Sequence, residues 1–236
     1  MRVLVTRPEI AAARTAGRLK AMGHEPVHLP LAKAVHDLPT AADALRQEHA
    51  ALAVTSAEAL RVLAAETLRP LIDLAKPLFA VGEATAGAAT SMGFSEVHAS
   101  AGDGADLAGL IAARSGTTTA PILYLAGNPR AKTLESRLAE FGIPFRLAEI
   151  YEMVAVEYEP DDLASRLNNA HAQALLLYSH ETAIRFFKIV PADLAALAGT
   201  RILCISERTA DAVPAAFRPL AEIAESPNET ALLALL

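Results

Sequence analysis

The sequence contains an internal repeat, in which two copies of one pattern follow each other along the chain. The segments LVTRPEIAAARTAGRLKAMGHEPVHL from Leu4 and LYLAGNPRAKTLESRLAEFGIPFRL from Leu123 both read as strand, turn, amphipathic helix, glycine and extended segment. Each copy is followed by a second matching pair, VTSAEALRVL with AVGEATAGAA in one case and LYSHETAIRF with CISERTADAV in the other. Repeats of this length imply two similar domains, and such domains usually hold a ligand in the cleft between them. We therefore expect the functional site in that cleft.

Length and composition argue against several classes of protein. A chain of 236 residues suits two domains of ordinary size. The net charge of −6 and the aromatic content of 5% argue against binding of nucleic acid. Because the chain has no run of about 18 apolar residues and its start, MRVLVTRP, lacks a signal-peptide pattern, we expect a cytoplasmic protein without a membrane span. The single cysteine, Cys204, has apolar neighbours and is predicted to be an inert, buried strand residue.

Short runs of Val, Ile and Leu alternate with longer segments of helical period. This alternation predicts an α/β fold in which buried parallel strands are joined by helices. In the helix that follows Leu125, we expect Leu134, Leu138 and Phe141 to form one buried stripe and Gly142 to be the C-cap. Strands are expected near residues 2–5, 52–55, 78–81, 121–125, 174–178 and 201–205.

Two segments break this alternation and occupy the same place in the two repeats. Residues 26–38 and 143–160 begin as the last strand of a βαβ unit and then stay extended. If they pair as a two-stranded β connector, with strands about 27–38 and 147–158, one domain is discontinuous, 1–34 plus 155–236, and the other is 35–154. A single division near the middle of the sequence fits the periodicity almost as well.

Polar and small residues follow the predicted strands at six junctions. In open parallel sheets the ligand lies beyond the carboxyl ends of the strands, where helix N-termini offer free N–H groups. Helix capping alone would explain each of these residues equally well. Together, in two copies, they predict a cleft for a flexible polyanion. We expect added positive charge from cations on first helical turns, namely Arg7, Arg130, Lys132 and Arg208, which could also be ordinary surface cations.

The sequence lacks the motifs of several well-known catalytic and nucleotide-binding sites. It has no P-loop, no GxSxG, no HExxH and no CxxC, and the glycines from Gly102 have the wrong spacing for a nucleotide fingerprint. The scattered histidines do not indicate a metal site. A catalyst of this kind would act mainly by holding its substrate in shape.

The order and spacing of the motifs resemble the uroporphyrinogen-III synthase (HemD) family over nearly the whole chain. The segments that carry this resemblance are VLVTRP, VTSAEAL, AVGEATA, GNPRAKTLESRLAEFG, EIYEMV, YSHETA, CISERTA and ESPNETALL. The resemblance implies two Rossmann-like (flavodoxin-like) α/β domains, the first discontinuous, joined by a two-stranded ladder with the active site between them.

The implied activity is that of a lyase of haem, sirohaem, cobalamin and chlorophyll biosynthesis. It would cyclise hydroxymethylbilane, a linear tetrapyrrole, with loss of water and inversion of ring D, to give uroporphyrinogen III. The resemblance implies no cofactor. It also leads us to expect a monomer and a transient handover of substrate from hydroxymethylbilane synthase.

The resemblance assigns roles to individual residues. The family's conserved tyrosine corresponds to Tyr151, whose phenol could donate a hydrogen bond to the departing hydroxyl; otherwise it reads as a connector residue that packs its ring. Ser206 departs from the family, which usually has glycine there, and Tyr178 departs from a usual small residue. The residues predicted to bind the substrate are Arg7, Thr55, Ser56, Gly82, Thr85, Gly127, Asn128, Arg130, Lys132, Ser179, Arg208 and Thr209.

Two other functions fit parts of the pattern. A hinged pair of α/β domains would also suit a non-catalytic cytosolic protein that binds a small anion and signals its presence. A nucleotide-dependent transferase would need phosphate-binding glycines that the sequence lacks.

Overall fold

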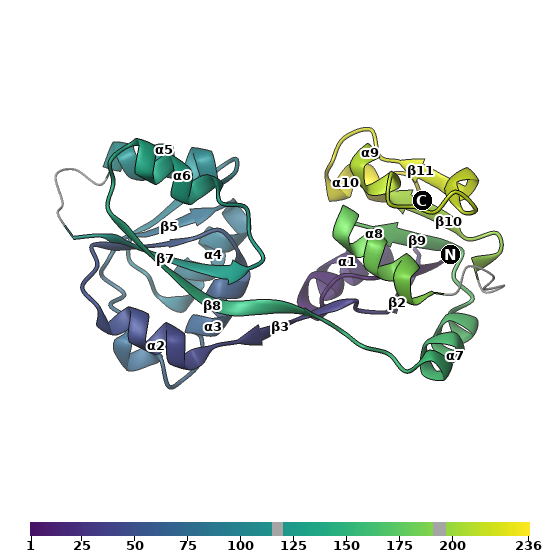
Figure 1. Ribbon diagram of the computed structural model, residues 1–236, viewed down its shortest axis with the longest axis horizontal. Coiled ribbons are helices and arrows are strands. Elements are labelled where there is room, and N and C mark those ends of the chain that lie inside the picture. The colour runs from purple at the N-terminus through teal and green to yellow at the C-terminus, as the bar shows by residue number, and fades with distance from the viewer. Residues whose placement is uncertain (115–119, 191–196) are drawn as a thin grey trace. The chain divides into compact units, whose positions relative to one another are not determined.

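The chain forms two compact α/β units. The computed structural model describes residues 1–114, 120–190 and 197–236. Unit 1 consists of Met1–Lys33 and Val154–Leu236, and unit 2 consists of Ala34–Met153 (Figure 1). The repeat in the sequence therefore corresponds to two units, of which unit 1 is discontinuous in the chain.

Unit 1 is built on a parallel sheet with the strand order β11-β10-β9-β1-β2. Its strands are β1 (Arg2–Val5), β2 (Glu25–His28), β9 (Ala174–Leu177), β10 (Arg201–Cys204) and β11 (Ala221–Ile223). Its helices are α1 (Glu9–Ala21), α7 (Pro160–Ala170), α8 (His180–Ile189), α9 (Glu207–Ala210) and α10 (Glu229–Leu233), with a short turn, η3 (Arg218–Leu220).

Helices cover both faces of this sheet. Val3 and Val5 pack with α1 and α10 on one face, whereas Leu4 packs with α7 and α8 on the other. The central strand β9, with the sequence ALLL, is buried along its whole length. A strand with both faces covered needs apolar residues at every position, which explains why continuous apolar runs identified these strands.

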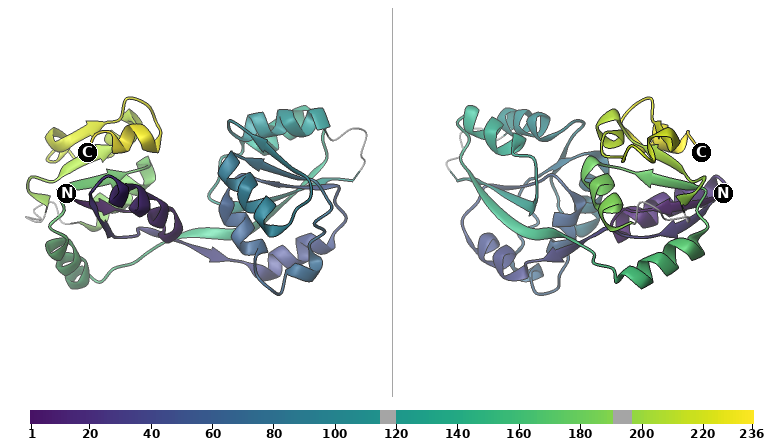
Figure 2. Two further views of the ribbon diagram at one scale, coloured as in Figure 1. Left: turned by 180° about the vertical axis from the view of Figure 1, so that it is seen from behind. Right: turned by 45° about the vertical axis from the view of Figure 1, so that its right-hand side comes forward.

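Unit 2 contains a sheet with the order β3-β8-β7-β4-β5-β6. Its strands are β3 (Ala32–His36), β4 (Ala51–Val54), β5 (Leu78–Val81), β6 (Val97–Ser100), β7 (Ile122–Asn128) and β8 (Phe145–Ala155). Its helices are α2 (Leu38–Arg46), α3 (Ala57–Leu63), α4 (Glu83–Met92), α5 (Gly104–Arg114) and α6 (Thr133–Glu140), with a turn, η1 (Arg69–Leu71). Figure 2 shows the helices of this unit on both faces of its sheet.

The two strands in which the chain passes from one unit to the other, β3 and β8, are neighbours in the sheet. The Asp37 amide donates to the Ile150 carbonyl at 2.8 Å, and the Val156 amide donates to the Leu31 carbonyl at 3.1 Å. The higher-numbered residue of β3's side is thus bonded to the lower-numbered residue of β8's side, which makes this pair antiparallel. All neighbouring pairs among the other strands of the sheet, and β7 with β8, are parallel.

The predicted α/β class is confirmed, and the predicted strands lie at or close to the expected positions. Two short edge strands, β6 and β11, were not predicted. The predicted buried stripe is wrong at one residue: Leu134 and Leu138 are buried, but Phe141 is 44% exposed. Because α6 ends at Glu140, Phe141 lies beyond the helix, and its ring packs under the Arg137 guanidinium at 5.0 Å.

One other prediction about burial, that for Cys204, is confirmed. Cys204 is buried at the end of β10. Within the described ranges, no helix combines the length and the apolar character needed to cross a membrane.

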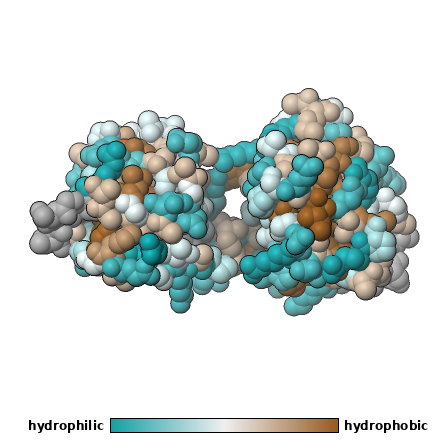
Figure 3. Space-filling view, turned by 90° about the horizontal axis from the view of Figure 1, so that it is seen from above, coloured by the Kyte–Doolittle hydropathy of each residue, from teal (hydrophilic) through white to brown (hydrophobic). Residues whose placement is uncertain are grey.

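On the face shown in Figure 3, hydrophobic side chains of unit 1 gather in a strip flanked by hydrophilic ones.

Candidate active site

The phenol of Tyr151 lies directly against the backbone of Gly127. These residues are register partners in β7 and β8, where a β-bulge between Ala126 and Gly127 shifts the pairing by one residue. A Cβ built on Gly127 would lie 2.2 Å from the ring atoms Cε2 and Cζ and 2.6 Å from the phenol oxygen. Residue 127 must therefore be glycine for the ring to occupy this place.

Ser56 is the polar partner of Tyr151. The Ser56 Oγ accepts a hydrogen bond from the Glu58 amide at 3.1 Å and so caps α3, and the Ser56 hydroxyl acts on the Tyr151 phenol to lower its pKa. Burial raises the pKa of Tyr151 above its usual 10.0, and this effect outweighs the lowering by Ser56. The phenol is therefore protonated at neutral pH and can donate a hydrogen bond.

A second phenol, that of Tyr124, lies in the neighbouring strand β7. Tyr124 is only 1% exposed, and its hydroxyl is 3.1 Å from the Oγ1 of Thr55. Tyr124 packs on the α5 and α6 face of the sheet, whereas Tyr151 packs on the opposite face. The hydroxyl of Thr55 therefore lies next to Tyr124 on one face of the sheet, and the neighbouring residue Ser56 acts on Tyr151 on the other face. Sequence reasoning missed Tyr124 because it stands within an apolar strand, although a tyrosine buried there needs a hydroxyl partner.

The loop between β7 and α6 contains two predicted cations in different surroundings. Arg130 Nε and Nη2 lie 2.9 and 2.8 Å from the Glu135 Oε1, and Nη1 pairs with Glu149. Burial alone would lower the pKa of Arg130, but these carboxylates outweigh it and raise the pKa. Lys132, at the N-cap of α6, is exposed and has no ion pair within the described residues. Neither cation lies in a first helical turn as predicted, since α6 begins at Thr133, and the charge of Arg130 is already compensated.

At the junction of β5 and α4, no side chain of the described residues covers the backbone of Gly82. Gly82 has φ of 77°, a conformation that strongly favours glycine, and a Cβ there would meet nothing within 4 Å. Thr85 is buried in the first turn of α4, and its amide donates to the Gly82 carbonyl at 3.1 Å.

In unit 1, the carboxylate of Glu229 in α10 binds four side chains. Glu229 Oε1 accepts hydrogen bonds from Arg7 at 2.9 Å, from Thr15 at 2.6 Å and from Tyr178 at 2.8 Å, and its Oε2 accepts from Arg18 at 2.9 Å. The Arg7 guanidinium also lies 4.2 Å from the centre of the Tyr178 ring. Arg7 precedes α1 instead of lying in its first turn, and its charge is used within the unit.

This cluster changes the acidity of two of its members. Burial is the main cause that raises the pKa of Tyr178 to about 12. Burial alone would also raise the pKa of Glu229, but hydrogen bonds from Thr15, Tyr178 and Arg18 and the charge of Arg7 lower it. Sequence reasoning missed Glu229; Arg7 and Glu229 are 222 residues apart, so no local pattern connects them.

The remaining hydroxyls of unit 1 act as helix caps. Ser179 accepts from the Thr182 amide at 3.1 Å, and Ser206 accepts from the Thr209 amide at 3.3 Å. Thr209 is buried, whereas Arg208 in the first turn of α9 is exposed. The capping interpretation therefore holds for Ser56, Ser179 and Ser206 alike, and it leaves the exposed groups free to contact a ligand.

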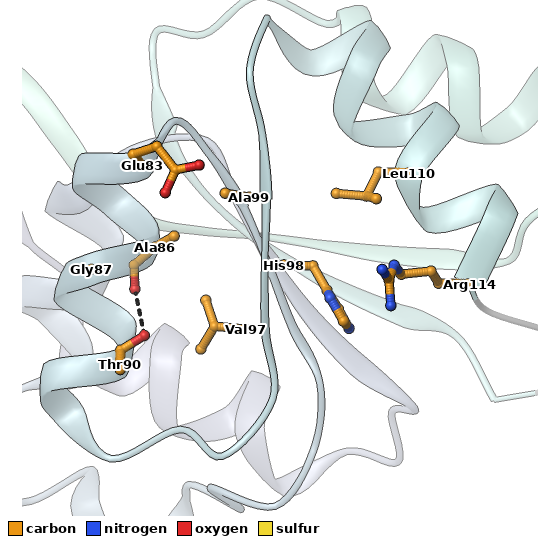
Figure 4. Close-up of a pocket in the computed structure, with 9 residues that line it drawn as sticks. All are labelled: Glu83, Ala86, Gly87, Thr90, Val97, His98, Ala99, Leu110 and Arg114. Atoms are coloured by element: carbon orange, nitrogen blue, oxygen red, sulfur yellow. Dashed lines mark hydrogen bonds between the residues drawn. The ribbon is translucent and has the colours of Figure 1, made fainter.

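A hollow of about 420 Å³ lies at the edge strand β6, away from these groups (Figure 4). Ala86 and Thr90 of α4 line one side, and Leu110 and Arg114 of α5 line the other. None of the predicted site residues lines it. The described residues contain no group of three His, Cys, Asp or Glu side chains that could hold a metal ion.

The fold and these strand-end groups define a duplicated, doubly wound α/β protein with a buried phenol beside a hydroxyl in one unit. Two solved structures share this fold. Uroporphyrinogen-III synthetase from Helicobacter pylori is 21% identical with a TM-score of 0.59, over 88% of this chain and 90% of that one. A mutant uroporphyrinogen III synthase from the extremely thermophilic bacterium Thermus thermophilus is 19% identical with a TM-score of 0.52, over 99% and 96%.

The sequence comparison identifies the family. The pattern of the family described as uroporphyrinogen-III synthase HemD matches residues 13–234. The chain therefore belongs to the uroporphyrinogen-III synthase family, cyclising lyases of tetrapyrrole biosynthesis. No sequence among the curated proteins matches significantly.

Proposed function

We propose that this chain converts hydroxymethylbilane to uroporphyrinogen III and that Tyr151 acts directly in this reaction. The observation that carries the proposal is the half-buried phenol of Tyr151, which lies against Gly127 and is influenced by the Ser56 hydroxyl, in a chain of this family. A protonated phenol in a partly dry site is a suitable donor to a leaving oxygen.

The chemistry needs one proton donor and a controlled shape. The terminal hydroxyl of the substrate leaves as water, and its carbon becomes an electrophilic azafulvene. Attack by the substituted carbon of the last pyrrole gives a spiro intermediate, which fragments and recloses with ring D inverted. Tyr151 assists the first step by donating its hydrogen bond to the departing hydroxyl. Because the substrate also cyclises unaided to the symmetric isomer, the protein acts largely by favouring the spiro geometry.

The acetate and propionate arms of the substrate require hydrogen-bond donors and positive charge. We assign this role to Thr55, Ser56, Gly82, Thr85, Gly127, Asn128 and Lys132 in unit 2 and to Ser179, Arg208 and Thr209 in unit 1. Lys132 and Arg208 carry exposed charges that a carboxylate can reach. To bind a carboxylate of the substrate, Arg7 would first have to release Glu229, and Arg130 would have to release Glu135. We therefore propose that these two arginines stabilise the loops that follow β1 and β7.

Finer expectations extend the proposal. We expect the protein to act in the cytoplasm as a monomer and to receive hydroxymethylbilane by transient handover from hydroxymethylbilane synthase. The instability of the free substrate favours such a handover, since time in solution yields the wrong isomer. Light scattering during size-exclusion chromatography tests the oligomeric state, and dilution of a coupled assay tests the handover.

The decisive experiment is to incubate the protein with freshly generated hydroxymethylbilane, oxidise the products and separate the uroporphyrin isomers. We expect isomer III to predominate, with isomer I in the protein-free control. Isomer I alone, together with saturable binding of the bilane, would instead indicate a non-catalytic anion-binding protein.

A further inference from the structure

Two consecutive residues of β8 face the same core. Ile150 is fully buried in a cluster that includes residues of α2 and α3, and Tyr151 packs against that same cluster. In a regular strand, by contrast, neighbouring side chains point to opposite faces. Ala126 of β7 pairs with Glu149, and the next residue of β7, Gly127, pairs with Tyr151. Ile150 is thus the extra residue of a β-bulge, and this bulge brings the phenol to the backbone of β7.

Without the bulge, the phenol would lie elsewhere. Continued regular pairing would set Ile150 opposite Gly127, and Tyr151 would then lie opposite Asn128. A shift of one residue turns a side chain to the other face of a sheet, so the Tyr151 ring would leave both the cluster and Gly127. The place of the phenol therefore depends on what fixes the register of β8 at this point.

An ion-pair network fixes β8 just before the bulge. Arg130, in the loop that follows β7, pairs through Nη1 with Glu149, the last residue of β8 before the bulge. Its Nε and Nη2 lie 2.9 and 2.8 Å from the Oε1 of Glu135 in α6. The side chains of Arg130 and Glu135 are each only 14% exposed. A guanidinium that is held by two carboxylates in such a place has a well-defined position, and so has the strand to which it is bound.

We propose that Arg130 is a positioning residue for Tyr151. Through its ion pair with Glu149, it fixes the register of β8 and so maintains the bulge that sets the phenol against Gly127. This inference rests on the proposed function for its catalytic consequence, but not for its geometry. Because Nε, Nη1 and Nη2 of Arg130 already bind Glu135 and Glu149, the arginine acts through β8 and not by holding a carboxylate of the substrate.

The α-protons of Gly127 report the position of the ring. A Cβ in place of one of them would lie 2.2 Å from two ring carbons, so that proton points at the Tyr151 ring and its NMR shift depends on the ring current. In protein labelled at glycine, Gly127→Ala identifies the signal by its absence, and Tyr151→Leu gives the shift without a ring. We expect Arg130→Gln and Glu149→Gln to move the Gly127 shift toward the value in Tyr151→Leu.

A second ion pair of unit 2 supplies matched controls. Arg137 pairs with Glu140 within α6, so Arg137→Gln and Glu140→Gln remove the same charges from an ion pair that lies within one helix. Both controls should leave the Gly127 shift at its wild-type value. Because the proposed effect runs through one ion pair, the double variant of Arg130 and Glu149 should move the shift no further than Arg130→Gln alone.

Kinetics on fresh hydroxymethylbilane separate positioning from substrate binding. A displaced phenol slows the chemical step, so Arg130→Gln should lower kcat for isomer III about tenfold. Its KM should stay within about twofold of the wild-type value, because the arginine does not contact the substrate. An unchanged Gly127 shift in folded Arg130→Gln and Glu149→Gln would overturn the proposal, and so would a raised KM with an unchanged kcat.

The design separates two failures. The Oε2 of Glu135 is buried without a partner among the described residues, so loss of Arg130 also removes the hydrogen bonds that its Oε1 accepts. If Arg130→Gln does not fold for this reason, Glu149→Gln decides alone, because Glu149 is 46% exposed and its loss leaves Arg130 paired with Glu135. If Tyr151→Phe retains full activity, the catalytic role of Tyr151 fails, yet the Gly127 shift still decides whether Arg130 positions the ring.

Discussion

The ring of Tyr151 occupies the space that a side chain on Gly127 would need. A Cβ at residue 127 would lie 2.2 Å from two ring carbons, far inside van der Waals contact. Since the backbone of Gly127 does not have a positive φ, the glycine serves this close approach and not an unusual turn. The absence of a side chain at Gly127 in β7 thus allows the Tyr151 ring of β8 to lie across the neighbouring strand.

This contact predicts the effect of adding one methyl group. Gly127→Ala should push the phenol away from Ser56, lower kcat for isomer III about tenfold or more, and cost roughly 1–3 kcal/mol of stability. Assays of isomer ratio and thermal unfolding test this. Gly109→Ala is the control, because a Cβ there meets nothing within 4 Å in α5. A Gly127→Ala enzyme with wild-type kcat would contradict the role of the contact.

The two members of the hydroxyl pair should contribute unequally. Tyr151→Phe removes the proposed donor to the leaving group, so kcat should fall about a hundredfold. Ser56→Ala removes the hydroxyl that caps α3 and acts on the phenol, and it should lower kcat about tenfold or less. Steady-state kinetics on fresh substrate distinguish the two, and equal activity of Tyr151→Phe and wild type would remove Tyr151 from the mechanism.

Glu229 should contribute measurably to the free energy of unfolding of unit 1. Glu229→Gln weakens charged hydrogen bonds to four partners, so the free energy of unfolding should fall by about 2 kcal/mol. Urea titration measures this change. Glu225→Gln, in the exposed segment just before α10, should change stability by less than about 0.5 kcal/mol.

The same residue predicts a dependence on pH. The pKa of Glu229 in the folded state lies below its usual 4.5, so the folded state favours the carboxylate. The stabilisation is complete above pH 4.5 and is lost as the pH falls through the lower, folded-state pKa. The stability difference between wild type and Glu229→Gln should therefore shrink in acid. A difference that stays constant on acidification would be inconsistent with an ionised Glu229.

Cys204 should be unreactive in the folded protein. Burial raises the pKa of its thiol to about 11, so almost no thiolate is present at neutral pH. Iodoacetamide should label Cys204 only after unfolding, at a rate set by the denaturant. Rapid labelling in native buffer would contradict the buried position.

Much of the fold could be predicted because its central strands are continuous apolar runs. The exceptions follow the same rule: β6 and β11 are edge strands with mixed sequences, VHAS and AEI, and carry no such signal. Phe141 shows the other limit, since helical spacing predicted burial at a residue that lies just beyond the helix end.

The site could be predicted only in part. Small and hydroxyl residues at strand ends were visible because parallel sheets place them on one edge. Their partners were not visible, since the pairing of Arg7 with Glu229 and of Ser56 with Tyr151 depends on distant parts of the chain. Local patterns therefore overestimated the free positive charge at Arg7 and Arg130.

The discontinuity of unit 1 determines the order in which the chain can be completed during synthesis. All of unit 2, Ala34–Met153, has been translated before β9, the strand that pairs with β1, exists. Residues 1–33 must therefore remain without β9 while unit 2 is made, and Arg7 stays unpaired until Glu229, 222 residues further along the chain, has been added. A ribosome that stalls late would leave one unit folded and the other without its closing residue.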